Sequence, residues 1–237
     1  WDAVTGETQP LRNLSRREGG MGLPVELEPY QSFFVVFDKM GKIGPDKTVI
    51  ADDFPDTRTV MTLTGPWTVA FDPAWGGPEH IVFDRLDDWS KRPEEGIRHY
   101  SGIAAYSMTF DMPRSEAASK GRGLTIDLGI VKNLARVKLN GKELGVVWTA
   151  PWRVRISDAV RDKGNRLEIE VANLWINRLI GDESEPWDGV EAGRWPAWLL
   201  EGTPRPSNRF TFTTHRFYTK DDPLIESGLL GPVRVMR

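Results

Sequence analysis

The chain has 237 residues, of which 39% are hydrophobic and 27% are charged, enough for one substantial hydrophobic core. Its 31 basic and 34 acidic residues leave a formal charge of -3 with no dense basic run, which argues against nucleic acid as a partner. No apolar stretch approaches the roughly eighteen residues of a membrane span, and the absence of Cys excludes disulfides and thiolate metal sites.

The first 40 residues carry two short β-like patterns. Val25 and Leu27 alternate with glutamates, and an apolar, β-rich run extends from Ser32 to Phe37. We expect two strands here, too few to fold alone, and interpret residues 1–40 as the tail of a preceding β-domain. Gly, Pro and Asp residues over 41–59 predict a linker. Because the chain begins at Trp1 rather than Met, we expect it to be an excised piece or a processed product.

From residue 60 onward, short apolar stretches alternate with turn residues. The expected strands are Trp67–Asp72, Ile103–Asp111, Gly123–Leu128, Leu134–Leu139, Val146–Trp148, Arg153–Ile156, Arg166–Asn173 and Val233–Met236. The dipeptide Asn140-Gly141 is typical of a two-residue hairpin turn, so it predicts an antiparallel pair. Helical patterns are limited to one turn near 157–161 and a short stretch near 195–200. Strands without crossover helices predict an all-β antiparallel sandwich of the jelly-roll type over 60–237.

The C-terminal part adds one more expected strand and a closing contact. Aromatic and Thr residues alternate from Arg209 to Tyr218, as they would in a strand. In jelly rolls the last strand commonly pairs near the first, so we expect Val233–Val235 to lie beside Trp67–Phe71.

Several motifs in this order resemble a known family of domains. They are Gly65-Pro66-Trp67, Leu86-Asp87-Asp88-Trp89-Ser90, Tyr100-Ser101-Gly102, Asp127-Leu128-Gly129, Leu139-Asn140-Gly141-Lys142, Pro151-Trp152, Gly164-Asn165-Arg166-Leu167 and Asn173-Leu174-Trp175-Ile176-Asn177-Arg178. The series is similar to the galactose-binding-like β-sandwich that serves as the sugar-binding domain of glycoside hydrolase family 2. It resembles more closely the C-terminal region of family 106 α-L-rhamnosidases.

The resemblance implies a much longer bacterial enzyme that acts on plant polysaccharide in the periplasm or outside the cell. Its catalytic acids would lie on an upstream barrel domain, and the present chain lacks the eight-fold βα pattern and the length of such a barrel. The resemblance therefore implies an accessory domain with a carbohydrate ligand and with the upstream barrel as its partner.

A dense group of carboxylates lies in one expected loop. It comprises Asp182, Glu183, Glu185, Asp188 and Glu191. Glycoside hydrolysis needs two carboxyl groups on opposite sides of the scissile bond, but no spacing here singles out a pair. Three interpretations stay open, namely a solvated acidic loop, a rim that contacts sugar, and a catalytic pair.

Ten Trp residues are more than a chain of this length usually carries, and their flat apolar faces suit sugar rings. The candidates for sugar binding are Trp148, Trp152, Trp175, Asn177, Arg178, Asp182, Trp187, Trp195 and Trp198. The alternative for each Trp is core packing. For Arg178 the alternative is an ion pair with Asp182, and for Asn177 it is to fix the turn that follows the strand.

Metal and cofactor sites have weak support in the sequence. His80, His99 and His215 are scattered without helical His/Glu spacing, so we expect no zinc site and no catalytic cofactor. A structural calcium ion would suit a sandwich of this kind, but no calcium-loop pattern identifies its ligands.

Three functional hypotheses follow. The leading one is a non-catalytic carbohydrate-binding domain of a large glycoside hydrolase. A self-sufficient small glycosidase would place two carboxylates of the 182–191 loop in one cleft with Trp187, Trp195 or Trp198. A domain with only a packing role would bury nearly all ten Trp residues.

Overall fold

The chain forms two compact units in the computed structural model, which describes residues 1–37, 53–54, 57–113 and 123–237. The units are Trp1–Arg58 and Thr59–Arg237. Most of the predicted linker at 41–59 lies outside the described residues. The linker and the assignment of 1–40 to a preceding domain therefore stay predictions.

Among the described residues of the N-terminal unit, β1 (Ser15–Arg17) and β2 (Gly20–Gly22) form a hairpin. The strands expected within 23–37 are wrong, because this described stretch forms only a single bridge, between Phe33 and Asp2. Proline at positions 24 and 29 removes two backbone donors, and the apolar side chains of 34–37 lie exposed instead of pairing in a sheet.

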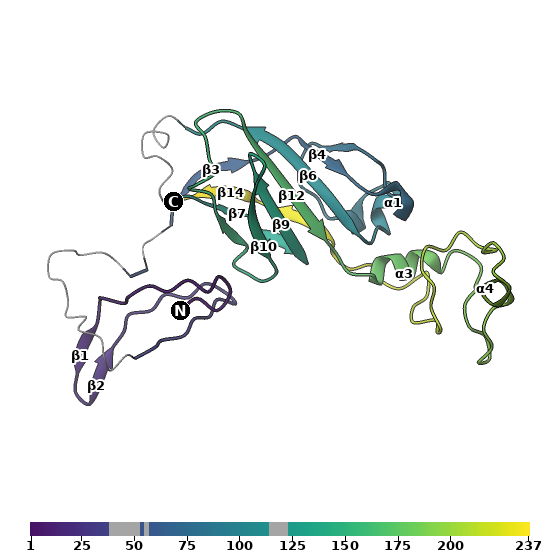
Figure 1. The fold of residues 1–237 in the computed structure, drawn as a ribbon, viewed down its shortest axis with the longest axis horizontal. Coiled ribbons are helices and arrows are strands. Elements are labelled where there is room, and N and C mark those ends of the chain that lie inside the picture. Colours follow the sequence, from purple (N-terminus) through teal and green to yellow (C-terminus); the bar gives the residue numbers. More distant parts are fainter. Residues whose placement is uncertain (38–52, 55–56, 114–122) are drawn as a thin grey trace. The chain divides into compact units, whose positions relative to one another are not determined.

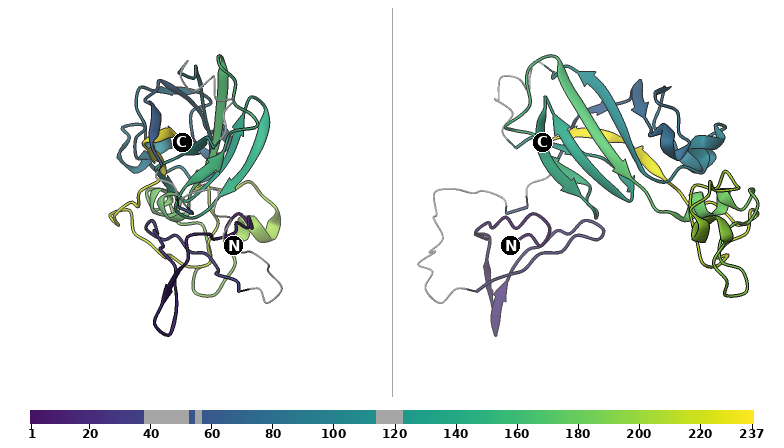
Figure 2. Two further views of the ribbon diagram at one scale, coloured as in Figure 1. Left: turned by 90° about the vertical axis from the view of Figure 1, so that its left-hand side faces the viewer. Right: turned by 45° about the vertical axis from the view of Figure 1, so that its right-hand side comes forward.

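The larger unit is a sandwich of antiparallel sheets (Figures 1 and 2). One sheet has the order β10 (Lys142–Val147), β9 (Leu134–Leu139), β12 (Asn165–Ala172), β6 (Ile103–Phe110), β4 (Trp67–Ala70), β5 (Ile81–Phe83). A second has the order β11 (Arg153–Arg155), β7 (Thr125–Asp127), β14 (Val233–Met236), β3 (Thr59–Leu63), and β13 (Gly228–Gly231) pairs with β8 (Ile130–Lys132). The predicted all-β antiparallel sandwich is confirmed.

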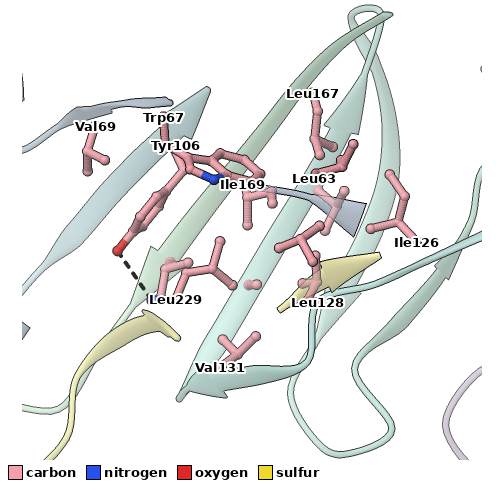
Figure 3. Packing of buried hydrophobic residues seen from close by; sticks show 14 of the residues in the cluster. Leu63, Trp67, Val69, Tyr106, Ile126, Leu128, Val131, Leu167, Ile169 and Leu229 are labelled. Atoms are coloured by element: carbon pink, nitrogen blue, oxygen red, sulfur yellow. Dashed lines mark hydrogen bonds between the residues drawn. The ribbon is translucent and has the colours of Figure 1, made fainter. Parts of the chain in front are cut away.

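Strict alternation of apolar and polar residues builds the core between the sheets. In β12, Leu167, Ile169 and Val171 are fully buried, while the intervening residues face outward. Figure 3 shows side chains from both sheets meeting, with the Tyr106 hydroxyl accepting a 3.2 Å hydrogen bond from the Leu229 backbone. Burial raises the pKa of this hydroxyl.

Short helices connect the strands. In the part of the chain that the structure describes they are the 3₁₀ turns η1 (Pro73–Trp75) and η2 (Trp89–Lys91), and the α-helices α1 (Glu95–Arg98), α3 (Ile176–Asp182) and α4 (Ala197–Glu201). The expected helix near 195–200 corresponds to α4, and 157–161 begins with a turn. The sequence interpretation missed α1 and α3.

Two predictions about the C-terminal part are wrong. β14 pairs with β3 and β7, whereas β4 lies in the other sheet, so Val233–Val235 is not beside Trp67–Phe71. The stretch Arg209–Tyr218 is not a strand, because its polar groups bind loop carboxylates instead of a neighbouring strand.

The hairpin prediction at Asn140-Gly141 is confirmed, since both residues have positive φ, 55° and 81°, between β9 and β10. Gly129 also has positive φ, 70°, but there an added Cβ would lie 2.3 Å from the Gly231 backbone. The bridge between these two glycines therefore requires a residue without a side chain.

We expect Gly129→Ala to destabilise the larger unit clearly more than Gly141→Ala, as measured by urea unfolding. Both changes place a side chain on a residue with positive φ, and this backbone strain costs about 1–3 kcal/mol in either variant. Only the first also pushes the bridge apart, because nothing lies within 4 Å of a Cβ at Gly141. Equal losses would contradict the close approach at Gly129.

Candidate functional site

Between α3 and β13 the chain leaves the sandwich in an excursion, residues 183–224, called the extension here (Figure 1). Apart from α4 it contains no helix or strand, and its residues are all described. Pro and Gly residues interrupt it repeatedly, which prevents longer elements. Irregular connections of this length are uncommon and usually functional, so what orders this one is informative.

Asn177 and Arg178 of α3 anchor the root of the extension. The fully buried Asn177 amide donates to Ile225 O at 2.8 Å and accepts from Ile225 N at 2.9 Å. Arg178 lies 3.8 Å from Asp182, donates to Trp75 O at 3.3 Å, and stacks 4.3 Å from the Phe210 ring centroid. The predicted Arg178–Asp182 pair is present, and both Asn177 and Arg178 have structural roles.

Asp182 is buried, and its carboxylate binds the later part of the extension at Thr211. One of its oxygens accepts hydrogen bonds from the Thr211 backbone at 2.7 Å and from the Thr211 hydroxyl at 2.6 Å. Its other oxygen faces Arg178. No face of this carboxylate is open to a ligand.

Asp188 is held by Arg205 in a two-point pair. Arg205 Nη2 donates to Oδ1 at 2.8 Å, Arg205 Nε donates to Oδ2, and Ser207 Oγ donates to Oδ2 at 2.6 Å. Burial acts to raise the pKa of Asp188, but these hydrogen bonds and the charges of Arg205 and Arg209 together hold that pKa below its usual value. The carboxyl is therefore ionised near neutral pH.

Arg209 forms the centre of the extension. Its guanidinium donates to Glu183 at 2.6 Å, lies 3.9 Å from Asp188, and stacks 5.0 Å from the Trp187 ring centroid. The side chain is only 2% exposed. Buried ion pairs thus fix the conformation of the extension, as backbone pairing in sheets fixes the rest of the larger unit.

These pairings argue against a catalytic role for the loop carboxylates. A general acid must keep its proton near the working pH, yet the pKa of Asp188 is lowered, and Asp182 and Glu183 also face arginines. Glu185 accepts a long, 3.4 Å bond from Asn208 N, and Glu191 is exposed. Of the five, Asp188 and Glu191 share a groove with Trp187 and Trp195, but the oxygens of Asp188 are occupied.

The Trp residues of the extension differ in which ring faces stay free. Arg209 and Arg216 each lie 5.0 Å from the Trp187 centroid. Trp198 donates from Nε1 to Asp188 O at 2.9 Å, with Arg205 5.5 Å from its centroid. Trp195 stacks on Phe212 at 6.0 Å and remains 52% exposed. Trp195 is the one that retains a large open surface.

Trp195 borders an open groove of about 510 Å³. Its lining is Trp187, Asp188, Gly189, Glu191, Ala192, Arg194, Trp195 and Pro196. The rim is a two-residue turn, in which Glu191 and Arg194 exchange backbone hydrogen bonds of 3.1 and 2.9 Å across Ala192 and Gly193. Both turn residues have positive φ, as a type I′ turn requires.

The other candidate Trp residues do not line this groove. Trp148 is exposed after β10, and Trp152 packs against the hydrophobic core before β11. Trp175 is half exposed and meets Trp75 edge to face at 5.3 Å. Across all ten Trp residues only Trp67 and Trp89 are fully buried, so the burial expected of a domain with only a packing role is not observed.

Metal ligands do not gather in the described residues. His80 is exposed beside Glu79, His99 packs on α3 at Gly181, and His215 contacts Thr214. No group of three or more His, Asp or Glu residues in the described ranges is arranged to hold an ion. Among the helices in those ranges, none combines the length and apolar character that a membrane crossing requires.

Sequence reasoning missed the arginines that order the extension. Arg205, Ser207, Arg209 and Thr211 all donate to Asp182, Glu183 or Asp188. These four residues are spaced two apart, which in an extended segment places their side chains on the same side. This spacing was the sequence signal that could have identified them.

Acidification should loosen the extension. The pKa of Asp188 is lower in the folded chain than in the unfolded chain, where it is about 4. The ionised carboxylate therefore contributes its full stabilisation above about pH 4, and this stabilisation is lost as pH falls through the pKa of the folded chain. We expect the protection of 183–224 against hydrogen exchange, measured relative to the unfolded chain at the same pH, to fall below about pH 4. In the Asp188→Asn variant, residues 183–224 should be less protected already at neutral pH, and their protection should change less on acidification. The same loss of protection on acidification in the variant as in the parent chain would contradict this account.

Comparisons with known proteins relate the chain to glycoside hydrolases. No protein-family model matches it. A protein of Formosa agariphila named "Putative beta-glucuronidase" is 42% identical over 191 residues, which cover 79% of this chain and 16% of the relative. The solved structure of a rhamnosidase from Novosphingobium sp. PP1Y superposes with a TM-score of 0.64 at 38% identity, again over 79% of this chain and 16% of the other. The chain is thus a β-sandwich related to glycoside hydrolases, and it spans 16% of the length of these relatives.

Proposed function

We propose that this chain is a non-catalytic, carbohydrate-binding β-sandwich domain of a large bacterial glycoside hydrolase. One observation carries the proposal: Asp182 at the end of α3 and Glu183 and Asp188 in the extension are all bound by arginines, while Trp195 keeps an open ring face over a groove. A domain arranged in this way is suited to hold a sugar and poorly suited to cleave one.

The finer assignment rests on the resemblance and the relatives. We infer that the chain corresponds to the C-terminal, galactose-binding-like jelly-roll region of a family 106 α-L-rhamnosidase-like enzyme. Hydrolysis would then occur on an upstream barrel domain, the substrate would be a plant polysaccharide, and the protein would be periplasmic or secreted. The names of the relatives, a glucuronidase and a rhamnosidase, support a carbohydrate ligand. A structural calcium ion stays a prediction without named ligands.

The groove offers the two kinds of contact that sugars require. The exposed face of Trp195 can stack on the apolar C–H face of a pyranose. Glu191 and Arg194 stand on the rigid turn at the rim, where a carboxylate can accept from hydroxyls and a guanidinium can donate to them. Because stacking on Phe212 fixes the Trp195 ring, little side-chain freedom is lost on binding.

Replacing Trp195 by alanine should weaken glycan binding about tenfold or more, a loss of about 1.4 kcal/mol, as measured by isothermal titration. The ligands would be L-rhamnose, galactose and pectic oligosaccharides. Trp148→Ala is the matched control, since Trp148 is 61% exposed but lies outside the groove, and it should bind like the parent chain. An equal loss in both variants, or no binding by the parent chain, would contradict the proposal.

A further inference from the structure

The extension contains a second open groove, of about 410 Å³. Its lining is Glu183, Arg216, Phe217, Tyr218, Thr219, Lys220, Asp221 and Asp222. Phe217 is 65% exposed, which gives this groove its own aromatic surface. The Thr219 backbone donates to Asp222 at 2.7 Å, and Asp222 N donates back to Thr219 O at 3.2 Å, so a closed turn orders this side.

A side-chain contact at Trp187 links the two groove linings. This ring lines the first groove, and the guanidinium that stacks on it, 5.0 Å away, belongs to Arg216 of the second. A second connection runs from Glu183 in the second groove through its pair with Arg209 to the same ring. The aromatic surfaces of Trp195 and Phe217 are therefore joined through one rigid cluster.

The charges along both grooves balance. In the first groove Asp188 is neutralised by Arg205, which leaves Glu191 and Arg194 with opposite charges. In the second, Glu183 is neutralised by Arg209, which leaves Arg216 and Lys220 against Asp221 and Asp222. A surface with many hydrogen-bonding groups and no net charge favours a neutral, hydroxyl-rich ligand over an anionic one.

We propose that the two grooves form one binding track for a neutral oligosaccharide longer than a single sugar, with Trp195 at one end and Phe217 at the other. This inference rests on the proposed function and specifies its ligand. It requires that affinity increase with the number of sugar rings, because only a longer chain reaches both aromatic surfaces.

The test is isothermal titration of the 237-residue chain against neutral pectic galactan and arabinan fragments of one to six sugars. For the series that binds, we expect affinity to rise at least tenfold from the shortest to the longest fragment. Phe217→Ala should remove this gain and leave the affinity for a single sugar unchanged, whereas Trp195→Ala should weaken every fragment. Raising NaCl to about 0.5 M should have little effect, since screening acts on ionic contacts.

Phe34→Ala is the matched control, because Phe34 is 63% exposed but belongs to the N-terminal unit. It should bind like the parent chain. Affinity independent of fragment length, or equal weakening of short and long fragments by Phe217→Ala, would overturn the track while leaving the Trp195 site intact. Strong salt dependence would overturn the neutral ligand, and failure of both neutral series to bind would overturn the track and count against the proposed function.

Discussion

Replacing Arg209 by alanine is expected to unfold the extension and leave the sandwich folded. The Arg209 side chain is 2% exposed and serves Glu183, Asp188 and the Trp187 ring at once. Removal of one partner from a buried ion pair leaves an uncompensated charge and typically costs about 3–5 kcal/mol. Because the extension has few backbone ladders of its own, this loss exceeds what the remaining contacts can offset.

Hydrogen exchange resolved by residue measures this effect. We expect backbone amides of 183–224 to lose protection in Arg209→Ala, while those of β12 and β6 keep theirs. The control is Arg166→Ala, because Arg166 pairs with Glu168 at 3.1 Å on an exposed face, where such a pair contributes no more than about 1 kcal/mol. Unchanged protection of the extension in Arg209→Ala would refute the view that buried arginines order it.

Replacing Asn177 by aspartate should destabilise the whole larger unit. The Asn177 amide group donates to Ile225 O and to Ser227 Oγ, at 2.8 and 3.1 Å, in a fully buried position. A carboxylate has the same shape but cannot donate, and it would face the Ile225 carbonyl with a negative charge. The bond to the Ile225 carbonyl is lost outright, since that oxygen can only accept, and a buried polar group left unsatisfied costs about 1–3 kcal/mol, which is several times the effect of a surface change.

Urea unfolding followed by Trp fluorescence measures this loss. Glu170→Gln is the control, since it is also isosteric but lies on the outer sheet face, where Glu170 pairs with Lys138 at 2.8 Å. The deficit of Asn177→Asp should shrink as acid protonates the new carboxyl group. A deficit that is small or independent of pH would contradict the role assigned to the Asn177 amide.

Strands with strict alternation could be predicted from the sequence. Leu134–Leu139 and the strand beginning near Arg166 were expected within a residue of their observed bounds, and Asn140-Gly141 identified their neighbouring turn. Such signals are local, because the period of two and the positive φ of a turn are properties of a few adjacent residues. The 23–37 stretch shows the limit: β-like composition does not make a strand unless a partner strand lies beside it.

The candidate site was predictable only in part, because its order depends on contacts distant in sequence. The acidic loop, its Trp residues and the local Arg178–Asp182 pair were identified, yet Arg205 and Arg209, which bind Asp188 and Glu183, lie 17 and 26 residues away from them. Which Trp keeps an open face depends on Phe212 and on those same arginines. The alternating aromatic pattern from Arg209 to Tyr218 predicted a strand, whereas the donors interleaved with it carry the structural role.

The central claim is that this chain holds glycan without cleaving it, and an assay for released sugar tests that claim most directly. The purified chain would be incubated with the glycans that it binds, and new reducing ends would be measured over time. We predict saturable binding with no release above the rate without protein. Release that disappears in a variant with both Asp188→Asn and Glu191→Gln, while Trp148→Ala keeps it, would contradict the account and identify the chain as a glycosidase.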